Sequence, residues 1–246
     1  MDLADKVVLI TGVRRIGASV AEELARRGAH VSVSYHVSAD DADRAAAAVR
    51  DRNRRALVTQ VDLSNADACR HLVSATVLEF GHLHALINMA SNYLSRPFDE
   101  LTESDLDQTL AVDVRGAYLC ALAAVPHLRA AGGGHIINFS DWVARSGRPR
   151  YLGFLPYYVA KSAVVGLTEA LALELAGDGI LVNAIAPGPI RPSSEMDDAE
   201  VEKVARATPL GRWGGDQEVA KTIVALLESG FITGETIRVD GGRHLK

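Results

Sequence analysis

The sequence has few cysteines, no excess of basic charge and no long apolar run. Two cysteines, Cys69 and Cys120, make a disulfide scaffold or a cysteine zinc site unexpected. The 26 basic residues are outnumbered by 31 acidic ones, which argues against a dedicated nucleic-acid-binding protein. The longest uninterrupted apolar run, Ala117 to Val125, is nine residues and too short to span a bilayer. The first residues lack the basic-then-apolar pattern of a signal peptide, so we expect a cytoplasmic protein.

What is present is the alternation of a packed α/β chain. With 246 residues, 48% of them apolar, the chain fits one large domain or two small ones. Apolar β-branched runs predict strands at Val7–Thr11, Val31–Tyr35, Ala56–Thr59, Leu83–Asn88, His135–Ser140, Leu181–Ile185 and Thr236–Val239. Helical periodicity predicts helices at Ala18–Arg27, Ala42–Arg50, Ala66–Phe80, Leu101–Leu128, Tyr157–Leu175, Val201–Ala205 and Glu218–Leu227. The alternation indicates one doubly wound domain, residues 1–246, with a mostly parallel sheet of seven strands covered on both faces.

Three strand ends indicate a nucleotide site at the carboxyl edge of this sheet. The first strand leads through Gly12 and Gly17 into a helix, whose free backbone N–H groups and dipole favour a diphosphate. Asp62 closes the third strand, where a carboxylate can accept a hydrogen bond from an adenine amino group. Asn88 closes the fourth, and the small Ala90 after it lets the backbone approach a ribose. Each feature has an ordinary alternative: a glycine turn, a helix cap at Asp62, and a satisfied buried amide at Asn88.

A second signal lies at the start of the long fifth predicted helix. Tyr157 and Lys161 are four residues apart and share one helix face. An ammonium beside a phenol favours the phenolate, so Lys161 is expected to lower the pKa of Tyr157 toward that of a working general acid. The alternative is a solvated surface pair.

These motifs together resemble those of the short-chain dehydrogenase/reductase family over essentially the whole chain. The matching segments, in order, are Thr11-Gly12 with Gly17, Asp62-Leu63, Asn88-Met89-Ala90, Gly134–Ser140, Tyr157 with Lys161, Val182–Gly188, Ile232–Gly234 and Val239–Gly242. The resemblance implies a Rossmann fold with a nucleotide-binding part at about residues 1–130 and a catalytic part at about 131–246.

The resemblance also implies hydride transfer between a nicotinamide nucleotide and a carbonyl or alcohol. Tyr157 is then the proton donor, and Lys161 lowers its pKa and holds the nicotinamide ribose. The residues implied around the cofactor are Gly12, Ile16 and Gly17 at the diphosphate, Asp62, Leu63, Asn88 and Ala90 along the crevice, and Pro187, Gly188 and Ile190 beside the nicotinamide. The C-terminal Asp240-Gly241-Gly242 is expected to be a structural turn and subunit contact.

Several residues depart from the family pattern. The glycine loop is one residue shorter than usual, and Arg15 stands where the middle glycine is expected. Asp113 replaces the usual asparagine of the catalytic group, and Asp141 replaces the usual serine, with Ser140 just before it. Pro192 stands where a threonine often holds the carboxamide, which leaves Ser193 or the backbone to do so.

Some of these departures are similar to the pteridine reductases. Arg14–Gly17, Ser34–Ser38, Asn88–Ser91 and the aspartate at the serine position carry this closer resemblance. It implies NADPH-dependent reduction of a C=O or C=N bond in a pteridine-like or dihydrofolate-like substrate. One alternative is a 3-oxoacyl-thioester or other ketone reductase of the same family. Another is a non-catalytic NAD(P)-sensing relative.

Residues after the second strand predict NADP(H) in preference to NAD(H). An NAD-specific site needs an acid at the end of this strand, but the chain has Tyr35, followed by His36 and Ser38. Arg14 or Arg15 can supply the cation for a 2′-phosphate. Alternatively both arginines are solvated and Asp40 or Asp41 reaches back.

The identity of residue 141 predicts the kind of substrate. A serine donates a hydrogen bond to a carbonyl oxygen, which an ionised aspartate cannot do. Asp141 must therefore be protonated, or face a substrate with N–H donors such as a pterin ring. Alternatively Ser140 takes the serine's role and Asp141 caps a helix or pairs with Arg145.

Two further expectations concern the pocket and the assembly. The segment Arg191 to Pro209, with Trp213 beyond it, is expected to cover the pocket, and Trp142 and Phe154 to line it. Core packing is the alternative for these aromatic residues. The helices Leu106–Leu128 and Tyr157–Leu175 are apolar on more than one face, and the family resemblance implies that they pair across a two-fold axis in a homotetramer.

Overall fold

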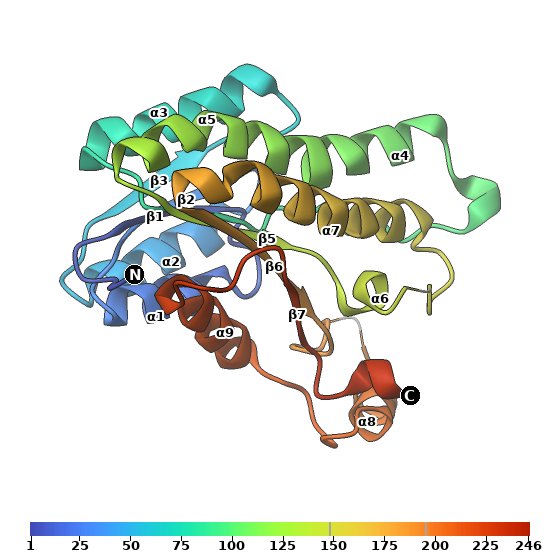
Figure 1. Ribbon diagram of the computed structural model, residues 1–246. Coiled ribbons are helices and arrows are strands. Elements are labelled where there is room, and N and C mark those ends of the chain that lie inside the picture. The colour runs from blue at the N-terminus through green and yellow to red at the C-terminus, as the bar shows by residue number, and fades with distance from the viewer. Residues whose placement is uncertain (148, 195) are drawn as a thin grey trace.

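The computed structural model describes residues 1–147, 149–194 and 196–246. In this part of the chain seven strands form one sheet in the order β3-β2-β1-β4-β5-β6-β7 (Figure 1). The strands are β1 Val7–Thr11, β2 His30–Tyr35, β3 Ala56–Gln60, β4 Ala85–Asn88, β5 Gly134–Phe139, β6 Ile180–Pro187 and β7 Thr236–Val239. All six neighbouring pairs are parallel, so the expected doubly wound domain is confirmed and its sheet is wholly rather than mostly parallel.

Helices cover both faces of the sheet, as the continuous apolar strands predict (Figure 1). One face carries α1 Gly17–Arg26, α2 Ala39–Arg50 and α9 Asp216–Glu228. The other carries α3 Ala66–Phe80, α4 Glu103–Leu110, α5 Ala117–Ala130 and α7 Leu155–Leu175. The helices α6 Trp142–Arg145 and α8 Asp198–Ala207 lie beyond the carboxyl edge with the C-terminus.

Alternating side chains of the strands build one core on each face of the sheet. From β1, Ile10 packs into the core that includes Leu24 of α1. Its neighbour Leu9 packs into the opposite core with Leu72 of α3 and Leu128 of α5. These side chains are fully buried, which fixes the strand register and brings the carboxyl ends of β1, β4 and β5 to one edge.

The predicted helix Leu101–Leu128 is interrupted in the structure. It begins at Glu103 with a capping box between Thr102 and Asp105, and a π-helical turn, Ala111–Gly116, joins α4 to α5. Such a turn carries one extra residue and is frequent at functional sites. Here it contains Asp113, whose side chain is fully buried.

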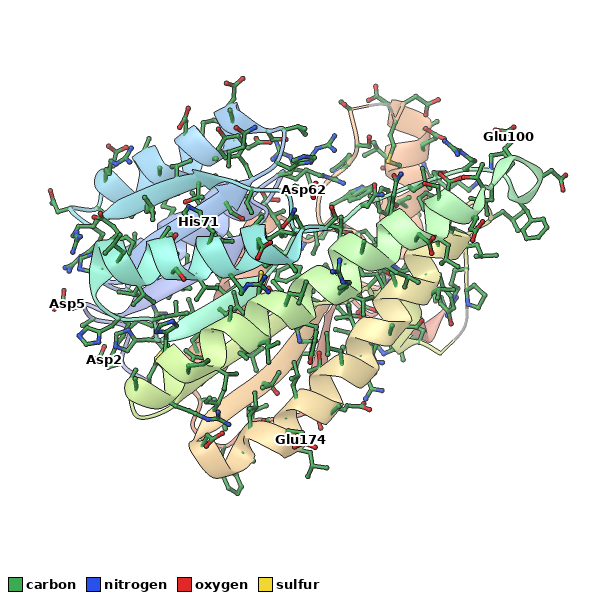
Figure 2. The ribbon with its side chains drawn as sticks, turned by 90° about the horizontal axis from the view of Figure 1, so that it is seen from above. Asp2, Asp5, Asp62, His71, Glu100 and Glu174 are labelled. Carbon is green, nitrogen blue, oxygen red and sulfur yellow. The ribbon has the colours of Figure 1, made fainter. Side chains whose placement is uncertain are left out.

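The same segment, Glu103–Ala130, is long and apolar enough to cross a membrane by length and composition alone. Its most apolar window is 44% buried inside the protein, and it packs against α3, α7, β4 and β5. Figure 2 shows it running beside α7 over the sheet. Length and apolar composition are weak evidence of a membrane span, because the core helix of a globular protein passes the same test. The contacts with two helices and two strands are those of a helix packed on the sheet.

Candidate active site

Tyr157, Lys161 and Asp141 come together at the carboxyl edge of β5. Tyr157 and Lys161 lie on the first two turns of α7, which has Pro156 in its opening turn. The Tyr157 hydroxyl donates to Oδ2 of Asp141 at 3.0 Å, and the Lys161 ammonium lies 5.6 Å from the centre of the Tyr157 ring. Tyr157 and Lys161 therefore share one face of α7, as their four-residue spacing predicts, and this face is directed into the protein.

Asp141 makes two contacts at once. It is the N-cap of α6, where its Oδ1 accepts from the Val143 backbone N–H at 2.8 Å, while Oδ2 faces Tyr157. Burial raises the pKa of Asp141, although the hydrogen bonds from Val143 and Tyr157 and the charge of Lys161 oppose this. The capping half of the alternative for Asp141 is thus present, but it leaves the second carboxylate oxygen at the tyrosine.

Tyr157 has a pKa well above its usual value. Burial is the largest cause, and the charge and hydrogen bond of Asp141 add to it. The sequence predicts the opposite, a lowered pKa of Tyr157, because that prediction considers only the ammonium of Lys161. In the structure burial, together with the charge of Asp141 and to a smaller extent that of Asp113, raises the pKa of Tyr157.

Ser140 points away from this group. β5 ends one residue before it, at Phe139, and the Ser140 hydroxyl donates to the backbone carbonyl of Lys161 at 2.8 Å. The side chain is 3% exposed and anchors α7 to the end of β5. The hydroxyl is therefore engaged with a backbone carbonyl, while the next residue, Asp141, occupies the position beside Tyr157.

Asp113 and Lys161 form a buried ion pair. Lys161 Nζ lies 3.0 Å from Asp113 Oδ2 and donates to the Phe139 carbonyl at 2.9 Å. The two side chains, Lys161 and Asp113, are 4% and 0% exposed. Asp113 also accepts from the Ser91 hydroxyl at 2.6 Å and from the Asn92 backbone N–H at 2.7 Å. The carboxylate therefore joins the π-helical turn, α7 and the segment after β4.

Tyr157 belongs to an aromatic cluster at this edge of the sheet. The other members of the aromatic cluster are Tyr93, Trp142, Tyr151 and Phe154. The Tyr93 ring stands edge-on to Tyr157 with centroids 4.8 Å apart and lies 5.0 Å from Phe154. Tyr151 connects Phe154 to Trp142, at 6.5 and 6.2 Å. The expected lining residues Trp142 and Phe154 are thus in the cluster. Tyr93 and Tyr151 were missed, and for Tyr93 the available signal is its position soon after the end of β4.

Trp213 does not belong to this aromatic cluster. Its indole N–H donates to the Val201 carbonyl of α8 at 3.1 Å, which fixes α8 to the segment before α9. This contact agrees with the packing alternative for Trp213, and its place at the substrate pocket stays a prediction. The expected covering segment, Arg191 to Pro209, contains α8, and its residue 195 lies outside the described residues.

The loop after β1 has the geometry of a diphosphate cradle. Gly12 has φ +72°, and a Cβ on it would lie 2.6 Å from the Ala90 Cα, so the backbones after β1 and β4 approach as closely as glycine allows. Gly17 opens α1, whose N-terminus has no side-chain cap and no acidic residue in its first turn. Its positive end is therefore left for an anion. These residues fit the diphosphate of a nicotinamide dinucleotide.

Arg15 joins this loop to the segment after β6. Its backbone has φ +71°, a conformation that favours glycine, which agrees with its place in the family pattern. Its guanidinium donates to the Arg191 carbonyl at 2.6 Å. Arg14 beside it is exposed, and Ile16 is the N-cap residue of α1.

The residues after β3 and β4 differ in how their polar groups are used. Asp62, labelled in Figure 2, is exposed between β3 and α3 and accepts from the Ser64 backbone N–H at 2.9 Å, which lowers its pKa. Leu63 beside it is buried in the core. Asn88 donates to Asn138 Oδ1 at 2.9 Å, but its own Oδ1 is buried without a partner among the described residues. The alternative of a satisfied buried amide therefore holds for the NH2 group of Asn88 but not for its Oδ1.

After β6 the chain is shaped by close packing. A Cβ on Gly188 would lie 2.5 Å from the Cβ of Asp240, and Pro187 just before it ends the strand. Asp240 accepts from the backbone N–H groups of Gly242 and His244, both at 3.0 Å, which makes this C-terminal segment a tight turn. Ile190 is buried against the core beneath α9.

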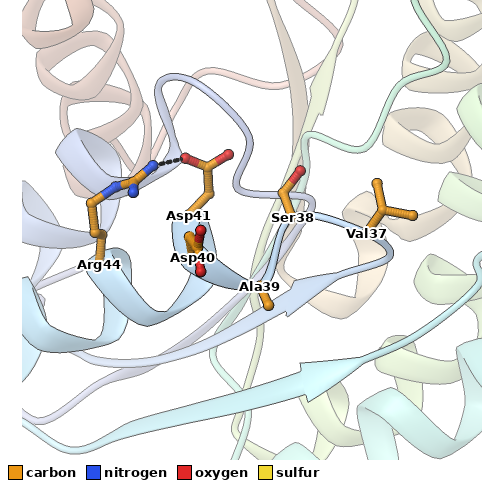
Figure 3. Close-up of a pocket in the computed structure, with 6 residues that line it drawn as sticks. All are labelled: Val37, Ser38, Ala39, Asp40, Asp41 and Arg44. Carbon is orange, nitrogen blue, oxygen red and sulfur yellow. Dashed lines mark hydrogen bonds and ion pairs between the residues drawn. The ribbon is translucent and has the colours of Figure 1, made fainter.

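A surface pocket of about 310 Å³ lies where β2 passes into α2 (Figure 3). It is lined by Val37, Ser38, Ala39, Asp40, Asp41 and Arg44. Arg44 is turned to Asp41, with which it forms an ion pair. Tyr35 ends β2 and His36 follows, exposed, so both the expected residues and the competing carboxylates lie at this end of the crevice.

Comparisons with known proteins agree with this geometry. Residues 12–244 match the family model described as Enoyl-(Acyl carrier protein) reductase. The 3-oxoacyl-[acyl-carrier-protein] reductase FabG of Staphylococcus aureus is 34% identical over 247 residues, covering 98% of each chain. The solved structure of a short-chain dehydrogenase/reductase from Serratia marcescens superposes with a TM-score of 0.90 at 32% identity, covering 99% of this chain and 100% of that one. A blue fluorescent protein from a metagenomic library, solved in complex with NADPH, gives a TM-score of 0.88 at 28% identity, covering 99% of each.

Proposed function

Because the chain belongs to the short-chain dehydrogenase/reductase family of oxidoreductases, we propose that it reduces a carbonyl group with Tyr157 as the proton donor. The observation that carries this proposal is the position of the Tyr157 hydroxyl, which lies 3.0 Å from Asp141 with Lys161 on the same helix face. The nicotinamide supplies the hydride when bound. As hydride forms the new C–H bond, the C=O π bond breaks and the Tyr157 proton forms the O–H bond. The carbonyl thereby gains two electrons.

We propose a 3-oxoacyl thioester or a related ketone as the substrate. The similarity to a 3-oxoacyl-[acyl-carrier-protein] reductase over 98% of the chain supports this class better than a pteridine. A bare ketone oxygen requires Asp141 to act in its protonated form, which its raised pKa favours. Asp141 then donates to the carbonyl oxygen as a serine would.

A pteridine or dihydrofolate remains the second candidate because of Asp141 itself. An ionised carboxylate beside Tyr157 suits a ring that offers N–H and amino donors. The aromatic cluster also provides edges and faces against which a flat ring can stack. The two candidates therefore differ in the protonation state that they require of one side chain.

For the cofactor we propose NADPH in preference to NADH. β2 ends at Tyr35, and the loop that carries the exposed Arg14 is tied to this strand by the Gly12 N–H, which donates to the Ser34 carbonyl at 3.1 Å. Arg15 is engaged with the Arg191 carbonyl. We expect a higher kcat/KM for NADPH, and a loss of that preference in Arg14→Ala but not in the control Arg206→Ala on α8. Equal efficiency with both nucleotides in the unmodified protein refutes the assignment.

The division of labour and the assembly are also proposals. We propose that residues 1–130 chiefly bind the nucleotide and residues 131–246 chiefly hold the substrate and the catalytic pair. We further propose a homotetramer, because α5 and α7 expose apolar side chains such as Leu122 at 58% and Leu173 at 82%.

The function is tested with the purified full chain and a panel of oxidised substrates. We expect NADPH oxidation with a 3-oxoacyl thioester and its loss in Tyr157→Phe. If no member of a panel of thioesters, diketones, dihydrobiopterin and dihydrofolate is reduced, while NADPH still binds, the non-catalytic sensing alternative replaces this proposal.

A pair of substitutions separates the substrate classes. Asp141→Ser is expected to keep or raise thioester activity, whereas a pteridine reductase would lose its activity with this change. Ser140→Ala is expected to leave the substrate preference unchanged because its hydroxyl bonds the Lys161 carbonyl. If Ser140→Ala is crippling and Asp141→Ser is silent, the role given to Asp141 is wrong.

A further inference from the structure

Asp113 uses both carboxylate oxygens within the fold. Oδ1 accepts from the Asn92 backbone N–H at 2.7 Å, and Oδ2 accepts from the Ser91 hydroxyl at 2.6 Å and pairs with Lys161 at 3.0 Å. The π-helical turn directs this side chain inward, where it is 0% exposed. An asparagine here can place only one oxygen, so the anionic form is what satisfies all three partners.

This ion pair changes the electrostatics at the tyrosine. A buried ammonium near a phenol stabilises the phenolate, but a carboxylate 3.0 Å from that ammonium offsets its charge. The groups that face Tyr157 are Lys161 on its own helix, Asp141 at the start of α6, Tyr93 in the segment after β4, and Asp113 in the π-helical turn. The Asp113 carboxylate is thus set against the Lys161 ammonium, and Asp141 adds a second negative charge only in its ionised form.

We infer that Asp113 is a positioning residue that holds Lys161 and compensates its charge, so that Tyr157 keeps its proton and the site is biased toward carbonyl reduction. This inference rests on the proposed function for its direction of reaction. In reduction the phenol gives its proton to the carbonyl oxygen as hydride reaches the carbon. In alcohol oxidation the hydride leaves the carbon, and a phenolate must accept the hydroxyl proton. A protonated tyrosine favours the first direction over the second.

The test is the titration of Tyr157 in the full chain without substrate. Tyrosinate absorbance is measured against pH. From each curve, the curve of the same protein carrying Tyr157→Phe is subtracted, which leaves the titration of Tyr157 alone. Asp113→Asn leaves the Lys161 charge uncompensated and is expected to lower the pKa of Tyr157 by about 1 unit or more. Asp107→Asn, which removes an exposed carboxylate of α4 by the same chemical change, is expected to leave the curve in place.

A double variant distinguishes charge compensation from a structural disturbance. Asp113→Asn combined with Lys161→Gln removes both charges, and its Tyr157 titration is expected to return toward that of the unmodified protein. If Asp113→Asn yields no folded protein, Lys161→Gln is compared with this double variant, and the double variant is expected to titrate at lower pH. In either comparison, an unchanged Tyr157 titration or an upward shift on removing Asp113 overturns the inference.

The kinetic consequence is measured separately. In Asp113→Asn the alkaline limb of kcat/KM for reduction is expected to move down by the same interval as the titration, and oxidation of the product alcohol to begin at lower pH. Because the absorbance titration needs neither substrate nor nucleotide, it tests Asp113 even if the proposed function fails. If the titration shifts as expected but the two pH–rate profiles do not, the bias toward reduction is overturned and the charge compensation stands.

Discussion

Gly12 lies in the predicted diphosphate loop after β1, where its backbone approaches that of Ala90 after β4. An alanine at φ +72° takes on the left-handed cost of about 1–2 kcal/mol. Its Cβ would also lie 2.6 Å from the Cα and 2.9 Å from the N of Ala90, both backbone atoms that cannot rotate away. Such overpacking adds about 1–3 kcal/mol. We therefore expect Gly12→Ala to lower the free energy of unfolding by about 2–5 kcal/mol.

Gly81 supplies a matched control for this change. It has φ +85° at the C-terminus of α3, and a Cβ there would meet nothing within 4 Å, so Gly81→Ala keeps the left-handed cost and omits the clash. Urea unfolding of both variants is expected to differ by about 1–3 kcal/mol, with NADPH affinity by fluorescence titration weakened only in Gly12→Ala. If the two variants lose the same stability within about 0.5 kcal/mol, the close approach of the strand ends is not what requires a glycine.

Two further predictions concern the cofactor loop and the assembly. Arg15→Gly is expected to be more stable to urea than Arg15→Ala by about 1 kcal/mol, since both lose the bond to the Arg191 carbonyl but only alanine keeps the unfavourable φ of +71°; equal stability or the reverse order contradicts this. If the proposed tetramer forms, Leu122→Glu on α5 is expected to reduce its mass in light scattering, whereas Leu78→Glu, on α3 and 89% exposed, leaves the mass unchanged. A monomeric mass for the unmodified protein at micromolar concentration refutes the proposed assembly.

The fold follows from local patterns, and that is why so much of it can be predicted. Strands buried on both faces read as continuous apolar runs, and β1 and β7 have the predicted bounds. The helix α3 also matches at both ends, because Asn65 caps it and Gly81 ends it in the left-handed conformation. These signals lie within a few residues of the structure that they determine.

What the sequence leaves open depends on contacts between distant segments. The π-helical turn at Asp113 is tied to Lys161 and to Asn92, which no periodicity relates to one another. Tyr93 reaches Tyr157, and Tyr151 reaches Phe154, only because the fold brings their separate loops together. The pKa direction of Tyr157 is likewise a property of the assembled group, so considering Lys161 alone gives the wrong sign.

The protonation state of Asp141 decides which substrate suits the site, and protein stability reports it without a substrate. Burial raises the pKa of Asp141 above that in the unfolded chain, so its carboxyl contributes stability fully below the unfolded value of about 3.9 and loses it as pH rises through the folded value. Asp141→Asn cannot ionise and keeps an oxygen for the Val143 N–H. We therefore expect the free energy of unfolding of Asp141→Asn to increase relative to that of the unmodified protein as the pH of urea unfolding is raised from about 4 to 8.

The pH at which this difference levels off marks where the Asp141 carboxyl ionises in the folded protein. A rise that continues through neutral pH supports a protonated Asp141 that donates to a ketone, and one complete below about pH 5 favours an ionised Asp141 that accepts from a ring N–H. A difference that stays constant, or that runs in the opposite direction, contradicts the raised pKa of Asp141 and with it the protonated Asp141 that a ketone substrate requires.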